Sequence, residues 1–180
     1  MNPRPQTFND VVGQEGVVER LRISVAGCKK SSTAMSHVLI DGPPGLGKTT
    51  IASAIASELD VNMYTVNAAN VRNIKSILPY LMTITLNSVL FIDEIHRLSP
   101  AVEEILYPAM EDFSCDLIVG EGSAARSLRI EIKPFTLVGS TTRLGLLTTP
   151  MRDRFGIPVR LNFYEVNDLI LVVTRAADLL

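Results

Sequence analysis

Apolar residues along the chain fall into two kinds of segment. Short, nearly continuous apolar runs predict strands at residues 37–41, 61–66, 88–93, 135–140 and 157–163. Apolar residues at helical spacing predict helices at 17–30, 50–59 and 165–180. Strands that alternate with helices predict an α/β fold in which helices sandwich a parallel five-stranded sheet. Without a visible linker, we expect one domain over residues 1–180.

Two further segments need a separate interpretation. Ser99 at an N-cap position, Pro100 at the first helical position and the acids that follow predict the start of another helix. Residues 74–84 are ambiguous, because Pro79 would kink or end a helix there.

Residues 117–132 predict a β-hairpin inserted between a helix and a core strand. Residues 116–120 and 126–132 alternate in polarity, and a glycine-containing turn separates them. Its apolar side chains leave two interpretations open. The hairpin either presents an exposed adhesive surface or packs against its own domain.

The run from Gly42 to Thr49 has the pattern GxxxxGK[ST], between a predicted strand and a predicted helix. In that context the loop is a phosphate cradle, because its backbone N–H groups and the helix N-terminus favour anions. Lys48 would then reach the β- and γ-phosphates, and the Thr49 hydroxyl would ligate Mg²⁺. The sequence therefore predicts that the chain binds a nucleoside triphosphate.

Asp93 and Glu94 follow the most apolar predicted strand. Ligands of parallel α/β proteins bind at the carboxyl ends of the strands, so both side chains are expected beside the phosphate loop. We expect Asp93 to hold Mg²⁺ through its water shell and Glu94 to orient and deprotonate the attacking water. A carboxylate pair favours hydrolysis over passive binding of the nucleotide.

Sequence reasoning leaves two other candidates undecided. Thr141 and Thr142 follow the strand at 135–140 and either cap a turn or contact the γ-phosphate or the lytic water. Arg152 and Arg154 are either solvated helix-end charges or include an arginine finger, which stabilises transition-state charge.

Composition limits the class of protein. The chain has 180 residues, 47% of them hydrophobic, and a formal net charge of −2. This balance lacks the basic surface that nucleic-acid binding usually needs, so if the protein acts on DNA, we expect other surfaces to hold it. Cys28 and Cys115 stand far apart and are expected to be reduced thiols of a cytoplasmic protein. No signal peptide or membrane-spanning run is visible.

The motifs together resemble one family closely. They are the opening at 4–14, the loop at 42–50, the strand end at 90–98, EEILYPAMEDF at 103–113 and the segment at 145–156. The chain resembles the large ATPase domain of RuvB, the Holliday-junction branch-migration motor of the AAA+ class of P-loop ATPases. One departure is Val11-Val12, where the family usually has Tyr-Ile.

The resemblance implies a role for each matched position. Asp93 and Thr49 would serve Mg²⁺, and Glu94 would act on water. Thr142 matches the first sensor, and Arg154 matches an arginine finger that acts on a neighbouring subunit's ATP. The segment from Arg4 to Gln14 would line the adenine pocket. Matched positions at or near the nucleotide are Arg4, Gly42, Gly45, Gly47, Lys48, Thr49, Thr50, Glu111, Asp112, Phe113 and Tyr164.

The resemblance also implies partners. These are RuvA, gripped by the hairpin at 117–132, further copies of the chain in a ring, in the family a hexamer, and a four-way DNA junction. The chain ends in what resembles the first helix of a lid, so we expect the family's lid and winged-helix domains to be absent. The DNA would then be contacted mainly by those missing regions. The alternatives are another AAA+ motor such as a clamp-loader subunit, or an ATP- and RuvA-binding module with little turnover.

Overall fold

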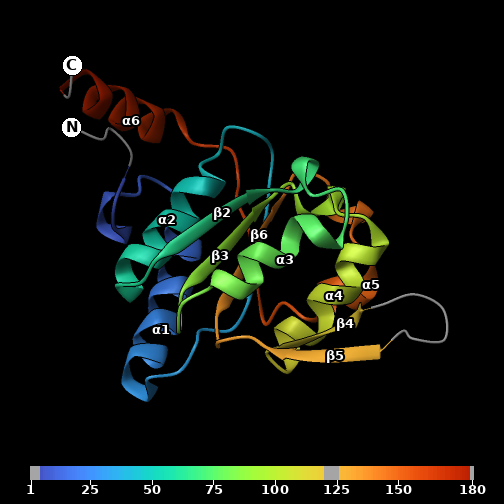
Figure 1. Ribbon diagram of the computed structural model, residues 1–180. Coiled ribbons are helices and arrows are strands. Elements are labelled where there is room, and N and C mark those ends of the chain that lie inside the picture. The colour runs from blue at the N-terminus through green and yellow to red at the C-terminus, as the bar shows by residue number, and fades with distance from the viewer. Residues whose placement is uncertain (1–4, 120–125, 179–180) are drawn as a thin grey trace.

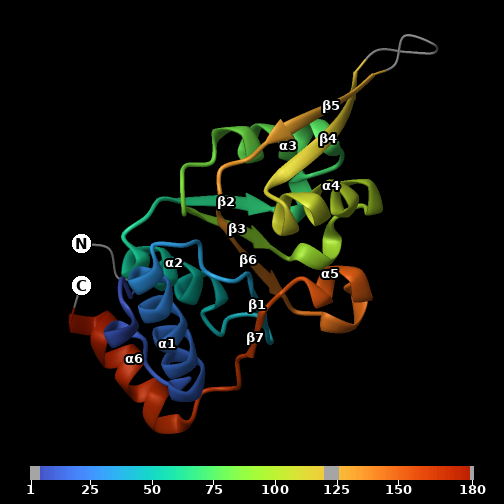
Figure 2. The same cartoon turned by 90° about the horizontal axis from the view of Figure 1, so that it is seen from below.

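The computed structural model describes residues 5–119 and 126–178. Its centre is a parallel five-stranded sheet of order β2-β3-β6-β1-β7, with helices on both faces (Figure 1; Figure 2). The strands are β1 (Val38–Asp41), β2 (Met63–Asn67), β3 (Val89–Asp93), β4 (Ser114–Val119), β5 (Arg126–Glu131), β6 (Thr136–Thr141) and β7 (Ile157–Arg160). The helices are α1 (Glu15–Ser31), α2 (Lys48–Leu59), α3 (Ile74–Thr83), α4 (Pro100–Glu111), α5 (Thr149–Asp153) and α6 (Val166–Asp178). The predicted fold is confirmed.

The strands are apolar on both faces because each face has its own hydrophobic core. In β1, Val38 and Ile40 pack with residues of α1 and α2, whereas Leu39 between them packs with residues of α3 and α4. All three are at most 3% exposed. The period of two along a strand therefore sends neighbouring side chains into opposite cores. This explains why the sequence shows continuous apolar runs and not alternation.

The strand order brings three loops together at one edge of the sheet. β6 lies between β1 and β3, and all three run parallel. The glycine loop follows β1, Glu94 follows β3 and Thr142 follows β6. Groups that lie up to 100 residues apart in the sequence thereby meet at the carboxyl edge, where parallel sheets bind their ligands.

Pro79 lies inside α3, which continues to Thr83 despite it. The helix begins with a side-chain cap, because Asn73 accepts a hydrogen bond from the Ser76 backbone N–H at 3.2 Å. Ile77 and Leu81, on either side of the proline, are at most 1% exposed. Burial of this apolar face stabilises the helix enough to offset the lost hydrogen bond. Whether burial would outweigh the lost hydrogen bond could not be predicted from the sequence.

The predicted end of the last strand is corrected. β7 ends at Arg160, short of the predicted 163. The Leu161 N–H still donates to the Asp41 carbonyl at 2.8 Å, and this is the last bond that joins the segment to β1. The chain then turns toward the N-terminal segment. Ser99 occupies the N-cap of α4 as predicted, but its hydroxyl makes no capping hydrogen bond.

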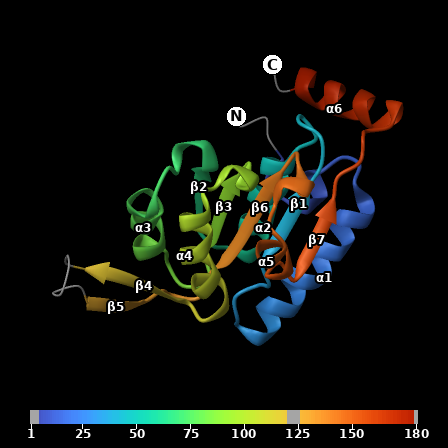
Figure 3. The same cartoon turned by 90° about the vertical axis from the view of Figure 1, so that its right-hand side faces the viewer.

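The inserted hairpin is formed by β4 and β5, which pair antiparallel with Leu117 opposite Leu128. It extends away from the sheet beyond α4 (Figure 2; Figure 3). Its base packs into the protein, since Cys115 and Ile132 are buried, whereas Leu128 is 54% exposed. The base of the hairpin thus packs against its own domain, and part of β5 is exposed; whether that exposed part binds a partner stays a prediction. The predicted turn at 120–125 lies outside the described residues.

Helix α6 lies beside the N-terminal segment that precedes α1 (Figure 3). Arg175 forms an ion pair with Asp10 at 3.4 Å and also donates to the Asp10 carbonyl at 2.5 Å. Most of its apolar side chains are exposed, including Val166 and Val173. Within residues 5–119 and 126–178, the helices are all too short or too polar to cross a membrane.

Candidate functional site at the carboxyl edge of the sheet

The loop between β1 and α2 requires glycine at two positions for different reasons. Gly47, at the N-cap of α2, has a φ of 85°, which L-residues other than glycine rarely adopt. A Cβ at Gly42 would lie 3.0 Å from the Leu161 carbonyl oxygen, so the neighbouring backbone would have to move. These constraints hold the loop open around the N-terminus of α2, where unpaired backbone N–H groups and the helix dipole favour an anion.

Lys48 is the first residue of α2, and its ammonium group is folded into the loop. It donates to the carbonyl oxygens of Gly42 at 2.9 Å and Pro43 at 2.8 Å. The side chain is only 8% exposed. The loop thus fixes a buried positive charge next to its own amide groups, where phosphate oxygens would add further acceptors.

Asp93 and Glu94 face the loop from the end of β3. A cavity of about 330 Å³ is lined by both carboxylates together with Lys48 and Thr49 of the loop. The Ser140 hydroxyl of β6 donates to Asp93 Oδ1 at 2.5 Å. This bond leaves Oδ2 as the second acceptor of the carboxylate. The four predicted residues therefore surround one hollow.

Glu94 turns away from the strand direction, with a φ of 52°. Its Oε2 accepts a hydrogen bond from the Thr142 hydroxyl at 3.0 Å and lies 3.2 Å from His96 Nδ1. The same ring nitrogen lies 2.9 Å from the Thr141 hydroxyl oxygen. Thr142, at the end of β6, thus holds Glu94 in place. The sequence left the role of Thr142 undecided and carried no signal for its contact with Glu94.

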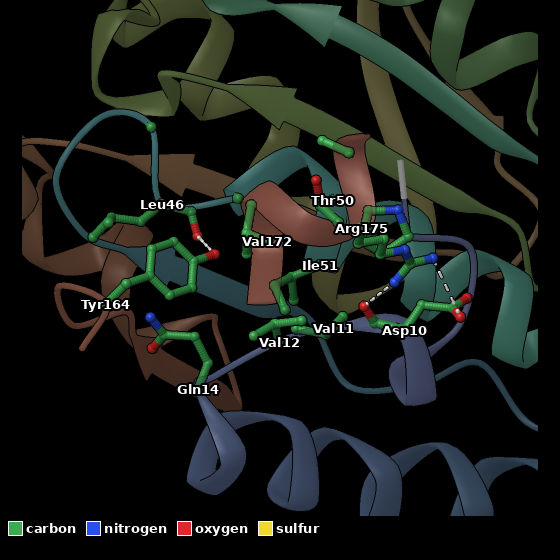
Figure 4. A pocket seen from close by; sticks show the side chains of 14 residues that line it. Asp10, Val11, Val12, Gln14, Leu46, Thr50, Ile51, Tyr164, Val172 and Arg175 are labelled. Atoms are coloured by element: carbon green, nitrogen blue, oxygen red, sulfur yellow. Dashed lines mark hydrogen bonds and ion pairs between the residues drawn. The ribbon is translucent and has the colours of Figure 1, made fainter. Parts of the chain in front are cut away.

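A second cavity, of about 250 Å³, lies on the other side of the glycine loop (Figure 4). Gly45, Gly47 and Thr50 line both cavities. The side chains that point into the second one are mostly apolar and come from the N-terminal segment, α2 and α6; they include Val11, Val12, Ile51 and Val172. A flat apolar group there and an anion in the first cavity would together span the loop, which is the shape of a nucleotide.

Tyr164 and Gln14 tie the walls of this second cavity together. The Tyr164 hydroxyl donates to the Leu46 carbonyl at 3.2 Å (Figure 4). Its pKa is raised, first by burial and then by the nearby Asp168 carboxylate, so it stays a neutral donor. Gln14 uses both halves of its amide on Asn162, donating to the carbonyl at 2.6 Å and accepting from the N–H at 3.0 Å.

The remaining wall comes from α6, which the sequence did not place at the site. Arg175 holds this helix against Asp10 (Figure 4). The backbone N–H groups of Thr7 and Gln6 lower the pKa of Asp10, with a smaller contribution from Arg175. The carboxylate is therefore a stable anion for the ion pair. Sequence periodicity predicted helix α6 but carried no signal for what it contacts.

The residues of the first cavity suit Mg²⁺ bound together with a triphosphate. Phosphate oxygens and water supply most ligands of Mg²⁺ in such sites, so one hydroxyl and one carboxylate from the protein suffice. Thr49 and Asp93 provide those two groups on one hollow. The described residues contain no cluster of three or more His, Cys, Asp or Glu side chains for a metal bound by protein alone.

Other predicted positions lie away from both cavities. Arg154, at the C-cap of α5, forms an ion pair with Glu111 at 3.2 Å at the end of α4. Asp112 is exposed beside Arg129, and the Phe113 ring packs edge-on against Phe135 with centroids 6.0 Å apart. None of these residues lines either cavity in its own chain. Arg4 lies outside the described residues.

The comparisons with known proteins agree on one family. The model of the Holliday junction DNA helicase RuvB P-loop domain matches residues 3–161. The Holliday junction branch migration complex subunit RuvB of Paracoccus denitrificans is 55% identical over 177 residues, 98% of this chain and 52% of that protein. Its counterpart from Paramagnetospirillum magneticum is 53% identical over 180 residues, all of this chain and 52% of that protein. The chain spans about half the length of these relatives.

Solved structures give the same result. The RuvB Holliday junction branch migration motor of Thermotoga maritima superposes with a TM-score of 0.87 at 44% identity, covering 98% of this chain and 54% of that one. A point mutant of the same protein superposes with a TM-score of 0.90 at 44% identity, covering 99% of this chain and 56% of that one. With the family model matched over most of its length, the chain belongs to the RuvB family of Holliday junction DNA helicases and contains the family's P-loop domain.

Proposed function

We propose that the chain is an ATP-hydrolysing subunit of a ring-shaped motor that drives branch migration of four-way DNA junctions. The observation that supports this most directly is the single hollow lined by Lys48, Thr49, Asp93 and Glu94. It combines an anion cradle, a hydroxyl and a carboxylate for Mg²⁺, and a second carboxylate for water. The relatives' name supplies the DNA substrate, and other surfaces of the motor would hold that DNA.

In this proposal ATP binds across the glycine loop. The adenine enters the apolar cavity beside Val12 and Tyr164, and the phosphates lie along the amide groups of the loop and the α2 N-terminus. Lys48 keeps its place and exchanges carbonyl acceptors for the β- and γ-phosphate oxygens. Thr49 and Asp93 would hold Mg²⁺ here, and the ion would supply positive charge to offset that of the phosphates.

Glu94 acts on the attacking water. As the general base it accepts a proton from that water, and its position decides whether the water lies in line with the γ-phosphate. Thr142 fixes one carboxylate oxygen at 3.0 Å, which leaves the other free for the water. Ser140, through its bond to Asp93, links the same strand to the Mg²⁺ side of the site.

Arg154 acts in trans. It lies outside both cavities of its own chain but is 21% exposed as a side chain, on a surface that a neighbouring subunit can approach. In a ring it stabilises the charge that develops on the γ-phosphoryl group of the neighbour's ATP. Glu111 pairs with Arg154 on this surface. We propose that Asp112 and Phe113, which follow Glu111 in the chain, lie near the neighbour's nucleotide and that Arg4 serves the adenine of its own chain. The hairpin β4–β5 binds RuvA.

Steady-state ATPase activity tests the proposal. The chain should hydrolyse ATP in the presence of Mg²⁺, and four-way junction DNA together with RuvA should raise the rate. Activity per subunit should also rise with protein concentration, because the finger belongs to a neighbour. A chain that binds ATP but turns over equally slowly under every condition would instead be an ATP- and RuvA-binding module. Stimulation by primed DNA and a sliding clamp, without any effect of junctions, would indicate a clamp loader.

A further inference from the structure

One face of α4 carries three polar residues, one on each successive turn: Glu103, Tyr107 and Glu111. The spacing of four residues places all three on the same side of the helix. Each of them contacts the short helix α5 or its caps. Glu103 accepts from Thr148, the N-cap of α5, at 2.8 Å. At the other end, Glu111 pairs with Arg154, the C-cap.

Tyr107 lies between the two glutamates, and the guanidinium of Arg154 stacks on its ring. The central carbon of that group lies 4.2 Å from the centroid of the tyrosine ring. This is well within the range of a cation–π contact, and a planar guanidinium can stack on the ring. Arg154 also donates to the Pro150 carbonyl at 2.7 Å, which bends the side chain back over its own helix.

The tyrosine ring is itself held in place. Its hydroxyl donates to Glu103 Oε2 at 2.9 Å, the same oxygen that accepts from Thr148. Glu103 is only 6% exposed, so this acceptor belongs to the buried part of the protein. The pKa of Tyr107 is raised, mainly by burial, which keeps the hydroxyl protonated as a donor. The buried Glu103 carboxylate therefore fixes the hydroxyl end of the Tyr107 ring, and Arg154 stacks on the face of the same ring.

We infer that Tyr107 is a positioning residue for Arg154. An arginine side chain has many rotamers, and ordering it at the moment of reaction would oppose catalysis entropically. The Tyr107 ring restricts these rotamers before a neighbouring subunit binds, while it leaves the terminal nitrogens able to exchange Glu111 for phosphate oxygens. The inference rests on the proposed role of Arg154 as a finger acting in trans.

A further observation fits this interpretation. Arg154 Nε is buried and has no hydrogen-bond partner among the described residues. A buried N–H without an acceptor is unfavourable, so the contacts within the chain do not satisfy the guanidinium fully. An unsatisfied donor of this kind is compatible with a side chain that exchanges partners in an assembly.

Substitutions at Tyr107 separate the ring from the hydroxyl. In the assembled protein with junction DNA and RuvA, Tyr107→Leu should lower kcat by about 10- to 100-fold, the scale of a misplaced catalytic group. Tyr107→Phe keeps the face for the guanidinium and should lose less. The KM for ATP should stay unchanged for both, because each chain binds ATP far from its own Tyr107. Tyr80→Leu makes the same change on α3 and serves as the matched control.

Combination with Arg154→Ala distinguishes positioning from a general loss of structure. If Tyr107 acts through Arg154, the double variant Tyr107→Leu/Arg154→Ala should be no slower than Arg154→Ala alone. Mixing Tyr107→Leu subunits with Glu94→Gln subunits should restore turnover, because each supplies what the other lacks. A structural defect in Tyr107→Leu would persist in the mixture. Losses of rate that add in the double variant Tyr107→Leu/Arg154→Ala would overturn the inference.

The two proposals fail in different ways. If Arg154→Ala keeps full activity in the assembled protein, Arg154 is not a finger and the proposed function loses that role. If Arg154→Ala is inactive but Tyr107→Leu matches Tyr80→Leu, the finger stands and the positioning role of Tyr107 is wrong. If activity per subunit stays constant over a range of protein concentrations in which the chain passes from monomer to assembly, no neighbour takes part and both are overturned.

Discussion

The Thr142 hydroxyl donates a hydrogen bond of 3.0 Å to Oε2 of Glu94, across 48 residues of sequence. The Thr142 backbone N–H lies 3.4 Å from the same oxygen. β3 and β6 are neighbours in the sheet, so the pair forms wherever both strands end at the same level. A carboxylate held on one oxygen has a defined direction, and in the role proposed for Glu94 that direction would decide whether it can act on a water at the γ-phosphate.

Removing the hydroxyl of Thr142 should therefore impair hydrolysis but not nucleotide binding. We expect Thr142→Val to lower the single-turnover rate by about 10- to 100-fold, because Glu94 loses its orientation. Thr142→Ser keeps the donor and should stay close to the parent. Rapid-quench measurement of ATP cleavage, with ATP affinity measured in parallel, checks this. Equal rates for the Val and Ser variants would mean that the bond does not orient Glu94.

Glu94→Gln should leave ATP bound and slow its hydrolysis by about 10²-fold or more, the scale of a lost general base. The amide keeps the size of the side chain and can still accept from Thr142, so the fold should not change. Single-turnover kinetics with excess enzyme measure the chemical step. A rate equal to that of the parent would assign the base to another group.

Lys48→Ala should remove most of the nucleotide affinity. Lys48 is only 8% exposed and its ammonium group donates to the loop carbonyls, so a cation from the solvent cannot easily replace it. Loss of one partner of a buried charge pair costs about 2–5 kcal/mol. Equilibrium titration with a fluorescent ATP analogue measures the loss. Lys30→Ala, at the exposed end of α1, is the control, and near-parental affinity of Lys48→Ala would contradict the assignment of the phosphate loop.

His37 should make the stability of the fold depend on pH. Its Nδ1 accepts from the Leu137 N–H at 2.9 Å, which leaves Nε2–H to donate to the Met110 carbonyl at 2.9 Å. The ring is therefore neutral, and burial lowers its pKa. The unfolded chain binds the proton first, below about pH 6.5. Stability should thus be complete above that pH and fall as the pH drops toward the lowered native pKa, by at most about 1.4 kcal/mol per pH unit.

Urea unfolding at pH 7.5 and pH 5.5 measures this effect. Carboxylates also titrate in the range, so the comparison is with His37→Gln, which offers an acceptor and a donor that do not titrate. The parent should lose more stability than the variant between the two pH values. An equal loss would show that His37 does not carry the linkage, whatever the burial of its ring.

The sequence predicts those parts of the site that depend on local order. The glycine loop with Lys48, and the aspartate–glutamate pair after an apolar strand, follow from short motifs and from the rule that parallel strands present ligand sites at one edge. The five strands follow from apolar runs, because both faces of the sheet are covered. Boundaries such as the early end of β7 depend on tertiary partners, so the sequence misplaced them.

Contacts between distant segments could not be predicted in the same way. The bonds of Glu94 to Thr142 and of Arg175 to Asp10 each join elements that no local pattern relates. α3 continues through Pro79 because its apolar face is buried, and burial is a property of the fold. One signal was readable and was missed: Glu103, Tyr107 and Glu111 recur every four residues, which marks a polar stripe on a helix whose other residues, apart from Glu104, are apolar.

The hairpin gives the last prediction. Leu128 is 54% exposed on β5, whereas Ile130 packs partly against the core. Leu128→Glu should therefore weaken RuvA binding by about 2 kcal/mol or more, the scale of a central interface residue, without changing ATP affinity or melting temperature. Ile130→Glu should lower the melting temperature as well, because it places a charge against apolar side chains.

Size-exclusion co-elution and a binding titration with purified RuvA measure the effect, with Ile23→Glu as control. Ile23 is 66% exposed on α1, so it carries the same kind of change on a surface remote from the hairpin. If Leu128→Glu binds RuvA as well as Ile23→Glu does, the exposed part of β5 is not the contact. If Leu128→Glu also loses ATP affinity, the hairpin supports the fold of the site and its exposed leucine is not simply a docking group.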